Sequence, residues 1–484
     1  MIARLDQTVP AATAAGITRR PSARVGLFSI GLAAYWPQFS GLRERLESYA
    51  AEVAARVSAW ADVIAAGLVD DVDSARAAGD LFAREQVDVI LLHTATYATS
   101  SQVLPAVQRA KVPVVVLNLQ PTAALDYAHV DTGEWLASCS TCCAPELAGA
   151  LARSRIPYAV VSGLLTDSDE SRAWQEIFGW CQAAGVVRAL ANARIGFLGH
   201  TYPGMLDMYS DFTQHHAHLG LHVEVLEMDD LQACVDGAGD REWTRVLDDT
   251  RALFELDTSV TDEQLAWSAR VAAGMDRLVD EYRLNALAYY YRGRGAFEEL
   301  GAALILGGSR LTARGIPCAG EGDLKTAVAM FIMDRLGAGG SYTEFYAMDL
   351  AEGFMLMGHD GPGHVAISDR RPTLRGLGLY HGKAGRGVSV EFSVKTGPIT
   401  ILGCTQTADG RLKLLVAEGE SLPGEILHIG NTNSRLRFAL PPDEFVDRWC
   451  REGPTHHVAL GVGHHAPTIE KVGRLLGLET VVLL

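Results

Sequence analysis

The sequence predicts an α/β protein in which two doubly wound α/β domains are followed by a C-terminal antiparallel β-barrel-like domain. Three observations support this prediction: short apolar runs alternate with helical stretches, the alternation restarts near residue 193, and short alternating runs follow the glycine-rich stretch 337–340. The chain has 484 residues, which at roughly 150 residues per domain suggests about three domains. We therefore expect a flexible N-terminal tail over 1–24, an N-terminal α/β domain over 25–192, a central α/β domain over 193–338 and a β-rich domain over 339–484.

The N-terminal domain begins with a strand followed by a helix. The apolar run 24–30 predicts a buried strand, and the stretch 41–65 has apolar residues at helical spacing. The runs 87–92 and 112–117, with a helix over 101–109 between them, are short and β-branched, as buried parallel strands are. Further expected elements are helices over 146–153 and 169–184 and a strand over 158–161.

The central domain repeats this alternation, and the C-terminal domain does not. The central domain is expected to contain strands over 194–200, 223–226 and 286–291 and helices over 262–282 and 322–336. Beyond residue 340 the runs 388–394, 400–403 and 412–417 are separated by turn residues, which indicates antiparallel sheet. A helix over 468–476 and a strand over 480–483 are expected to end the chain.

Composition and charge exclude several functions. Hydrophobic residues make up 48% and charged residues 21% of the chain, which is typical of a folded protein. The net charge of −16 argues against binding to nucleic acid or to an anionic membrane. No apolar run is long enough for a membrane span, and Arg19 and Arg20 lie where a signal peptide would be apolar. We expect a cytoplasmic protein that binds a small neutral molecule.

Eight cysteines in a chain of this length make a disulfide framework unexpected. Cys139, Cys142 and Cys143 form the one cluster whose spacing resembles a metal site. A single Cys-x-x-Cys pair supplies only part of a tetrahedral shell, so we interpret these residues as buried reduced thiols.

Polar residues follow two predicted strands of the N-terminal domain. Parallel sheets bind ligands beyond the carboxyl ends of their strands, which makes His93, Thr94, Asn118 and Gln120 candidates for ligand binding. For each of them, a role in closing a loop or capping a helix is equally consistent with the sequence.

Four patches in the C-terminal third together suggest a shell for one divalent metal ion. They contain Glu321, Glu344, His359 and the pair His464–His465. Two carboxylates with imidazoles suit Mn²⁺ or a similar ion better than structural zinc, which prefers thiolates. Taken singly, each has an ordinary alternative: Glu321 could stabilise a helix N-terminus, and Glu344 and His359 could be loop residues.

The flanking residues of these patches resemble the L-arabinose isomerase family, with L-fucose isomerases as more distant relatives. Residues 320–327 (GEGDLKTA) resemble the family's Glu-Gly-Asp-x-Lys-Thr-Ala signature. The runs around Glu344 and His359, the stretch 395–398 (KTGP) and the closing Gly463-His464-His465 are also similar to the family. The resemblance covers about residues 25–484 and is strongest in the C-terminal half.

The resemblance implies a Mn²⁺-dependent aldose–ketose isomerase, with Co²⁺ or Mg²⁺ as possible substitutes. It implies Glu321, Glu344, His359 and His465 as metal ligands, with His464 as the alternative one position away. The two glutamates are also the implied catalytic residues: one removes the C2 proton of the sugar and the other returns a proton to C1 through a cis-enediol. A metal-assisted hydride shift stays open. The family also implies homo-trimers or homo-hexamers with active sites between subunits.

The resemblance suggests further residues that face the substrate. They are Tyr35, Trp36 and Gln38 after the first strand, Met205 and Tyr209 after the strand ending at residue 200, and His464; His93, Asn118 and Gln120 are candidates from their place at the sheet edge. An aromatic pair with an amide suits a sugar, but contacts at a subunit interface explain Tyr35 and Trp36 equally well.

Departures from the family pattern concern the substrate. After His359 the chain reads DGPGH over 360–364, where the family has a Met-Leu-Glu-type segment. The interval from Glu344 to His359 is also short, which leaves Asp349 as a less favoured ligand. His364 is either a further polar group of the site or a turn residue.

The leading hypothesis is an isomerase that acts on a free aldopentose or deoxyhexose. An isomerase of another sugar, of the L-fucose or D-arabinose type, is the alternative among enzymes. From a different class, a sugar-binding or sensor protein would share two α/β domains, but it would explain neither the β domain nor its Glu and His patches.

Overall fold

The computed structural model describes residues 22–292, 295–377, 379–380, 383–384 and 386–483, and these form two units. One unit comprises residues 22–188 with 474–476, and the other comprises 189–473 with 477–483. The predicted flexible tail falls almost wholly on residues 1–21, which lie outside the described residues. The domain boundaries at residues 192 and 338 stay predictions.

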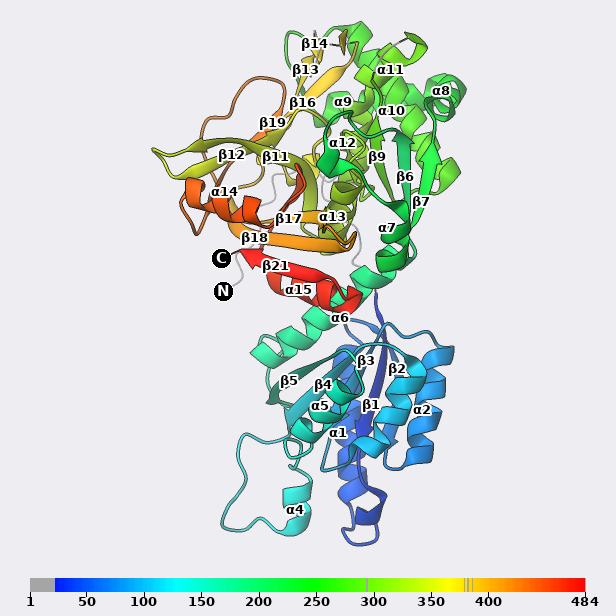
Figure 1. Ribbon diagram of the computed structural model, residues 1–484, viewed down its shortest axis with the longest axis vertical. Helices are drawn as coiled ribbons and strands as arrows, with labels where there is room; N and C mark the ends of the chain where they lie inside the picture. Colours follow the sequence, from blue (N-terminus) through cyan, green and yellow to red (C-terminus); the bar gives the residue numbers. More distant parts are fainter. Residues whose placement is uncertain (1–21, 293–294, 378, 381–382, 385, 484) are drawn as a thin grey trace. The chain divides into compact units, whose positions relative to one another are not determined.

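The first unit is a doubly wound parallel sheet, as predicted (Figure 1). Its strands follow the order β2-β1-β3-β4-β5. They are β1 (Arg24–Ile30), β2 (Asp62–Val69), β3 (Val89–Thr94), β4 (Val114–Gln120) and β5 (Tyr158–Leu164). The helices are α1 (Leu42–Val57), α2 (Val72–Arg84), α3 (Leu104–Ala110), α4 (Thr132–Leu136), α5 (Ala144–Arg153) and α6 (Arg172–Ala191). One core packs α1 and α6 on one face of the sheet, and a second packs α2, α3 and α5 on the other.

The helix predicted over 41–65 is wrong beyond residue 57. The helix α1 ends at Val57, and residues 62–69 form β2, which pairs in parallel with β1. This strand lies at the sheet edge and is exposed at alternate positions, so it lacks the continuous apolar run of β3 and β4. Its alanine-rich sequence therefore suggested helix.

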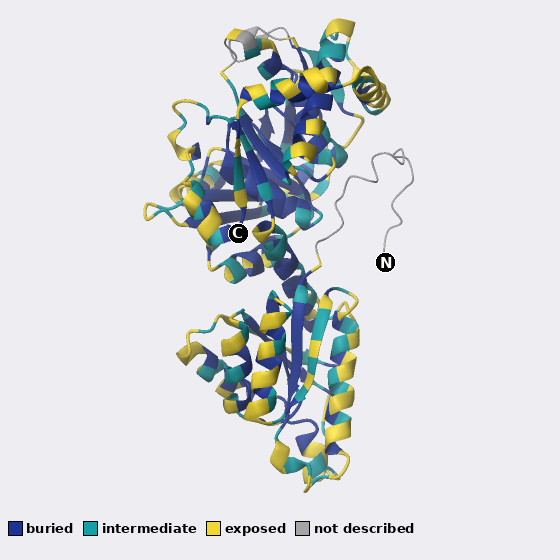
Figure 2. Ribbon diagram, turned by 90° about the vertical axis from the view of Figure 1, so that its right-hand side faces the viewer, coloured by how far each residue is buried: buried dark blue, intermediate teal, exposed yellow. Residues whose placement is uncertain are grey.

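The second unit contains a parallel sheet and a barrel. The sheet has the order β10-β9-β6-β7 and consists of β6 (Arg194–Gly199), β7 (His222–Leu226), β9 (Ala286–Tyr290) and β10 (Cys318–Ala319). Its helices are α7 (Phe212–Leu219), α8 (Met228–Gly237), α9 (Asp240–Leu253), α10 (Asp262–Tyr282), α11 (Glu298–Ala302), α12 (Leu304–Ala313) and α13 (Leu324–Arg335). In Figure 2 the strands of the sheets are largely buried, and the surrounding helices expose their outer faces.

The barrel is closed and antiparallel, which confirms the predicted fold class. Its six strands follow the order β17-β20-β11-β12-β19-β18 and close through pairing of β17 with β18, and β21 extends the sheet beside β18. The strands are β11 (Gly339–Asp349), β12 (Phe354–His359), β17 (Gly397–Gln406), β18 (Leu412–Leu422), β19 (Thr432–Phe438), β20 (Val458–Val462) and β21 (Glu479–Leu483). In the chain, α14 (Pro442–Arg451) lies between β19 and β20, and α15 (Ala466–Leu476) lies between β20 and β21. The short strands are β8 (Glu255–Leu256), β13 (Thr373–Gly376), β14 (Leu379–Tyr380), β15 (Lys383–Ala384) and β16 (Val388–Glu391).

Helix α13 joins the parallel sheet to the barrel. It contacts β9 on one side and β11, β17 and β20 on the other, and every residue from Leu324 to Asp334 is buried. A helix that is buried all round is fixed in position. The turn that precedes it, which carries Glu321, is therefore held between the sheet and the barrel.

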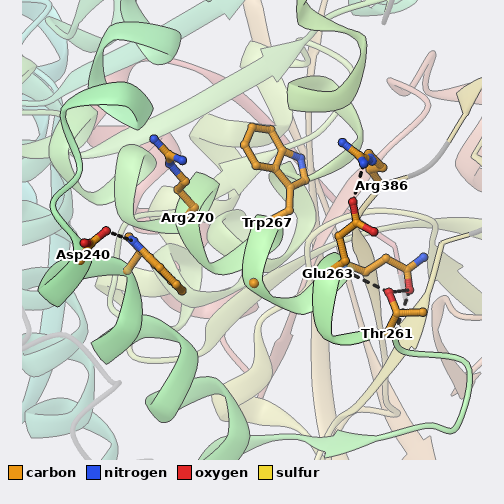
Figure 3. A pocket seen from close by; sticks show the side chains of 9 residues that line it. Asp240, Thr261, Glu263, Trp267, Arg270 and Arg386 are labelled. Atoms are coloured by element: carbon orange, nitrogen blue, oxygen red, sulfur yellow. Dashed lines mark hydrogen bonds and ion pairs between the residues drawn. The ribbon is translucent and has the colours of Figure 1, made fainter.

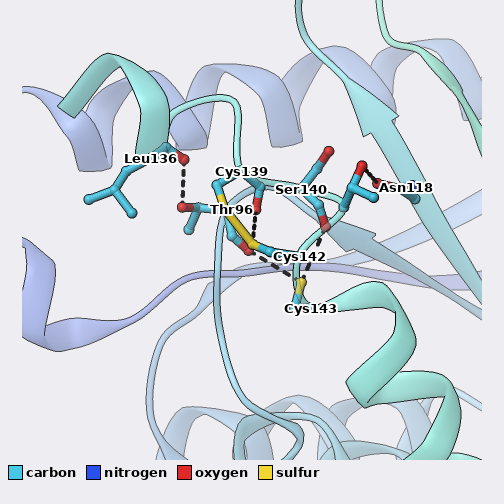
Figure 4. Close-up of a disulfide and its surroundings, with 8 residues drawn as sticks. Thr96, Asn118, Leu136, Cys139, Ser140, Cys142 and Cys143 are labelled. Carbon is cyan, nitrogen blue, oxygen red and sulfur yellow. Dashed lines mark hydrogen bonds between the residues drawn. A yellow bond between two sulfur atoms is a disulfide. The ribbon is translucent and has the colours of Figure 1, made fainter. Parts of the chain in front are cut away.

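The cysteine cluster differs from the prediction. Cys139 and Cys142 form a disulfide, whereas Cys143 is a buried free thiol (Figure 4). The spacing of the three residues is compatible with either arrangement, so the sequence did not distinguish them. No helix among the described residues is long and apolar enough to cross a membrane.

Candidate metal centre

The turn before α13 aims Glu321 at the carboxyl edge of the parallel sheet. Glu321 and Gly322 both have positive φ angles, 58° and 67°, a conformation that is uncommon for a residue other than glycine. A Cβ atom on Gly322 would lie 2.4 Å from the carbonyl oxygen of His200. The backbone N–H of Tyr202 donates to Glu321 O at 2.8 Å, and Gly322 N donates to Tyr289 O at 2.9 Å. The turn is thus locked against the ends of β6 and β9.

Strand pairing in the barrel brings the other groups to this turn. The strand β11 lies between β12 and β20, with Glu344 opposite Gly358 and Thr343 opposite Val458. This register sets the end of β12, with His359, and the residue before β20, with His457, on either side of β11. The rings of His359 and His457 both lie 4.4 Å from the ring of Tyr342, measured between centroids.

The ligand atoms of these side chains converge at distances suited to a shared ion. His359 Nε2 lies 3.8 Å from Glu321 Oε1, and His457 Nε2 lies 3.9 Å from Glu321 Oε2 and 3.9 Å from Glu344 Oε2. These separations are too long for hydrogen bonds. An ion held at about 2.1 Å by each ligand separates its ligands by about 3 to 4 Å, so the spacing fits one. Two overlapping groups result: Glu321, His359 and His457, and Glu344, His456 and His457.

His457 shows the polarity of a metal ligand. The residue is fully buried, its Nδ1 lies 3.0 Å from Asp323 Oδ2 and 2.7 Å from Tyr342 Oη, and its Nε2 makes no hydrogen bond. Because a carboxylate accepts the proton on Nδ1, the lone pair of the ring lies on Nε2, between the two glutamates. A carboxylate behind a histidine in this way is the usual support of a histidine ligand.

Asp323 is held by several donors. Burial tends to raise its pKa, but the hydrogen bond from His457 and the nearby positive charge of Lys325 hold the pKa below its usual value. Thr326 donates to this carboxylate from its backbone N at 3.0 Å and from its hydroxyl at 2.8 Å. Asp323 therefore both caps α13 and orients His457.

His456 pairs with the second glutamate. Its Nε2 lies 2.6 Å from Glu344 Oε2, and this hydrogen bond raises the pKa of His456. The backbone N of His456 donates to Asp207 Oδ2 at 2.7 Å. Two histidines in sequence thus hold different positions around one carboxylate.

The structure brings Glu321, Glu344 and His359 together but not His465. His465 Nε2 donates to Val462 O at 3.0 Å, and His464 Nε2 lies 3.3 Å from Gly419 O. Both belong to the opposite end of β20 from His457. We favoured them because parallel sheets carry sites at the carboxyl ends of strands, but β20 is antiparallel to β11, and its amino end adjoins Glu344.

The pair His456–His457, whose importance the sequence analysis missed, had one visible signal. It is a second pair of adjacent histidines at the other end of the same strand, eight residues before His464–His465. Asp349, the alternative ligand, accepts hydrogen bonds from the backbone of Ala351 and Glu352 in the hairpin after β11. His364 is buried and its pKa is lowered to about 4 by that burial, and it belongs to neither ligand group.

The remaining predicted substrate residues lie in two places. Met205 and Tyr209 follow β6, in a loop tied to the signature motif by Lys325, whose Nζ donates to Tyr209 O at 2.9 Å. The others lie in the first unit, at the carboxyl ends of its strands or just beyond: Tyr35, Trp36, Gln38, His93, Asn118 and Gln120. Their role in binding a substrate stays a prediction.

Several of these first-unit residues have local partners. The Ser29 hydroxyl lies 2.9 Å from Nδ1 of His93, and burial lowers the pKa of His93 to about 4. The Trp36 indole donates to Asp70 Oδ2 at 2.7 Å, and Gln38 donates to Ala34 O at 2.7 Å.

The cavity at the metal centre is small. Tyr202, Tyr290 and Pro362 line it with Glu321 and His359, and its volume is about 20 Å³, room for about one water molecule or ion. A second cavity of about 300 Å³ is lined by His456, Phe345 and Trp449, among others.

A larger cavity of about 520 Å³ lies beside α9 and α10 (Figure 3). None of its lining residues belongs to the metal centre. Their polar groups largely pair with neighbours: Arg386 with Glu263, and the Trp243 indole with Asp240.

Fold and centre together define the class of protein: an α/β chain with a closed β-barrel that carries a carboxylate–histidine centre where sheet and barrel meet. Residues 210–339 match the family model of the L-arabinose isomerase central domain. The chain is 24% identical to an L-arabinose isomerase of Nocardioides over 460 residues, covering 90% of this chain and 89% of the relative.

Sulfoquinovose isomerases are similar to the same degree. That of Alkalicoccus urumqiensis is 24% identical over 396 residues, covering 81% of this chain and 86% of the relative. That of Priestia megaterium is 22% identical over 418 residues, covering 86% and 90%. These similarities support a divergent member of the L-arabinose isomerase family.

Proposed function

We propose that this protein is a divalent-metal-dependent aldose–ketose isomerase. Its relatives are named isomerases of two different sugars, which supports the reaction class. One observation carries the metal dependence: the buried, hydrogen-bond-free Nε2 of His457 lies 3.9 Å from an oxygen of each of two glutamates.

The proposed ligands are Glu321, Glu344, His359 and His457. Their mixed oxygen and nitrogen donors favour Mn²⁺, with Co²⁺ or Mg²⁺ as substitutes. A divalent cation bound there supplies Lewis-acid polarisation of the sugar carbonyl, which acidifies the adjacent C–H bond.

The two glutamates are the proposed proton-transfer groups. One carboxylate accepts the proton from C2 of the aldose and the other delivers a proton to C1, so that a cis-enediol forms and collapses to the ketose. His456 Nε2 lies 2.6 Å from the same oxygen of Glu344 that faces His457, and this hydrogen bond fixes the orientation of the carboxylate. Asp323 would act on the reaction only through His457, so it is a positioning residue.

The proposed substrate is a free aldopentose or deoxyhexose, with another sugar as the alternative. A cavity of about 20 Å³ beside Glu321 and His359 cannot hold a sugar. We therefore propose that a neighbouring subunit of a homo-trimer or homo-hexamer completes the site, with Tyr35, Trp36 and Gln38 as candidate contributors. Loss of activity on dissociation would support this arrangement.

A screen for ketose formation tests the proposal. The full-length protein is stripped with EDTA, and aldopentoses, deoxyhexoses and sulfoquinovose are offered with and without added Mn²⁺, Co²⁺ or Mg²⁺. We expect turnover of at least one sugar that EDTA abolishes and Mn²⁺ restores. Equal turnover by stripped and Mn²⁺-loaded protein contradicts the metal mechanism.

The rival function is a sugar-binding or sensor protein. It predicts saturable sugar binding, measured by calorimetry, without formation of ketose in the presence of any of the three metals. For a sugar that is converted, reaction in D₂O separates the two routes: deuterium enters the ketose at C1 through an enediol and stays out in a hydride shift.

A further inference from the structure

The disulfide of the first unit lies in a loop with the features of a thiol-exchange site (Figure 4). Cys139 and Cys142 are three residues apart, with Cα atoms separated by 6.0 Å, a distance that a disulfide spans without moving the backbone. The loop connects α4 to α5, and Cys142 lies directly before Cys143, the N-cap residue of α5.

A disulfide over this spacing adds little to the stability of the fold. Cross-links stabilise a fold mainly by restricting the unfolded chain, and the effect grows with the length of the loop that they close. A loop closed between residues three apart is among the shortest, so stabilisation does not explain the bond. The Cys-x-x-Cys spacing is instead the one used by proteins that exchange disulfides with thiols.

The two sulfurs differ in access. Cys142 is exposed, whereas Cys139 retains only 7% of its accessible surface. Exchange requires a thiolate to reach one sulfur of the bond, so access selects Cys142 as the attacked residue. Cys142 also precedes the N-terminus of a ten-residue helix, which stabilises a thiolate formed there.

The third cysteine is separated from this chemistry. Cys143 is fully buried, and its Sγ lies 3.4 Å from Ser140 O and 3.5 Å from Thr96 O. Burial raises its pKa to about 11, so the thiol stays protonated at neutral pH. It does not compete for the disulfide.

We propose that Cys139–Cys142 is a redox-active disulfide that exchanges with a glutathione-like low-molecular-weight thiol. The thiolate bonds to Sγ of Cys142, the bond between the two cysteines breaks, and its electron pair leaves on Cys139, which takes up a proton. A second thiol then attacks the sulfur of the bound thiol, which leaves as a symmetrical disulfide, and Cys142 takes up a proton. Two thiols are oxidised and one protein disulfide is reduced, a balanced transfer of two electrons.

The exchange acts on the edge of the parallel sheet. Thr141, between the two cysteines, donates from its hydroxyl to Asn118 Oδ1 at 3.2 Å, and Asn118 donates to the Ser162 hydroxyl at 3.0 Å. The bond therefore fixes a loop that touches the ends of β4 and β5. Its reduction frees that loop.

A glutathione titration of the native full-length protein tests the proposal. The protein is equilibrated in buffers of increasing ratio of reduced to oxidised glutathione, quenched in acid, alkylated and analysed by peptide mass spectrometry. We expect Cys139 and Cys142 to become alkylated together as the ratio rises. Exposed Cys450 controls for reagent access, and buried Cys181 controls for unfolding.

Labelling of Cys139 and Cys142 that requires denaturant overturns the proposal, because the bond is then a closed structural one. Labelling at every glutathione ratio, without oxidation by oxidised glutathione, overturns it as well.

Two variants test which sulfur is attacked. Cys139→Ser leaves the exposed thiol alone and is expected to accumulate a glutathione adduct at Cys142. Cys142→Ser is expected to accumulate much less at Cys139, and equal adducts contradict the assignment. Amide hydrogen exchange of residues 137–143 is expected to rise on reduction while that of β1 stays constant; an unchanged rate contradicts the release of the loop. None of these measurements depends on isomerase activity.

Discussion

The two ends of strand β20 carry the same residues in different surroundings. Each end has two adjacent histidines and a glutamate: His456–His457 with Glu344, and His464–His465 with Glu418. At the first end, His457 is fully buried and its Nε2 makes no hydrogen bond. At the second end, His464 lies 4.0 Å from Glu418 and half of its side chain is exposed.

The two ends of β20 differ in the groups that surround each imidazole. His457 is backed by Asp323, so its lone pair faces two carboxylates. Nε2 of His465 donates to the carbonyl oxygen of Val462, which leaves the lone pair on Nδ1, but His465 belongs to neither ligand group found among the described residues. A histidine pair is thus a candidate metal site only where further ligand groups lie in front of the unprotonated ring nitrogen.

Removal of the charge of Glu344 should give the largest effect. We expect Glu344→Gln to lower turnover at saturating Mn²⁺ by about 10²- to 10⁴-fold, because the amide cannot transfer the substrate proton. The initial rate of ketose formation is the measurement, with circular dichroism as a check of the fold.

The matched control for this change lies at the other end of β20. Glu418 accepts a hydrogen bond from Ala466 N at 2.7 Å, which a glutamine can also accept. Glu418→Gln should therefore keep its turnover. A Glu344→Gln variant as active as wild type removes this glutamate from the mechanism.

Separate substitutions of His457 and His465 test directly which of the two is the metal ligand. His457→Gln should weaken Mn²⁺ binding by about 100-fold or more, since the loss of a ligand exceeds the effect of losing its support. His465→Gln should leave the affinity unchanged. Electron paramagnetic resonance of free Mn²⁺ measures both, and the reverse order of effects would restore His465 as the ligand.

The sequence predicted Glu321 as a candidate ligand but not His457, and the reason is physical. Glu321 belongs to a continuous motif whose turn and helix are local, so its neighbours in sequence are its neighbours in space. His457 reaches the centre through the pairing of Thr343 with Val458, more than one hundred residues apart. Nothing in either segment encodes that register, and the sequence alone left the choice between two histidine pairs open.

The fold class was predictable for a related reason. The strands β3 and β4 are buried throughout and appear as continuous apolar runs, whereas the edge strand β2 is partly exposed and was taken for helix. Barrel closure depends on the pairing of β17 with β18, which their short alternating runs suggested without specifying. The disulfide was not predicted because the spacing of two cysteines does not indicate whether they are oxidised.

A smaller effect is expected from a change of Asp323, whose carboxylate accepts from Nδ1 of His457. Asp323→Asn should lower Mn²⁺ affinity about 10- to 100-fold, because a neutral amide orients the ring but no longer increases its basicity. Asp349→Asn should have no effect on affinity, since Asp349 only holds the hairpin after β11. Equal affinities for the two variants would mean that Asp323 supports the helix and not the ligand.

The smallest effect concerns the pH dependence of stability. The pKa of His456 is raised in the folded protein by its hydrogen bond with Glu344, so the pair stabilises the fold most below the ordinary histidine pKa of about 6.5. This contribution is lost as the pH rises through the raised pKa. Because 42% of the side chain is exposed, we expect less than about 1 kcal/mol.

Urea unfolding of EDTA-treated protein measures this contribution. The pH is varied from about 5.5 to 9, on both sides of the ordinary histidine pKa of about 6.5. The stability difference between wild type and His456→Gln should be largest at the acid end and shrink towards the alkaline end. His464→Gln is the control from the other end of β20, where the nearest carboxylate lies 4.0 Å away. If His464→Gln shows the larger pH-dependent difference, the charged histidine–carboxylate pair belongs to the second end of the strand and the contrast between the two ends fails.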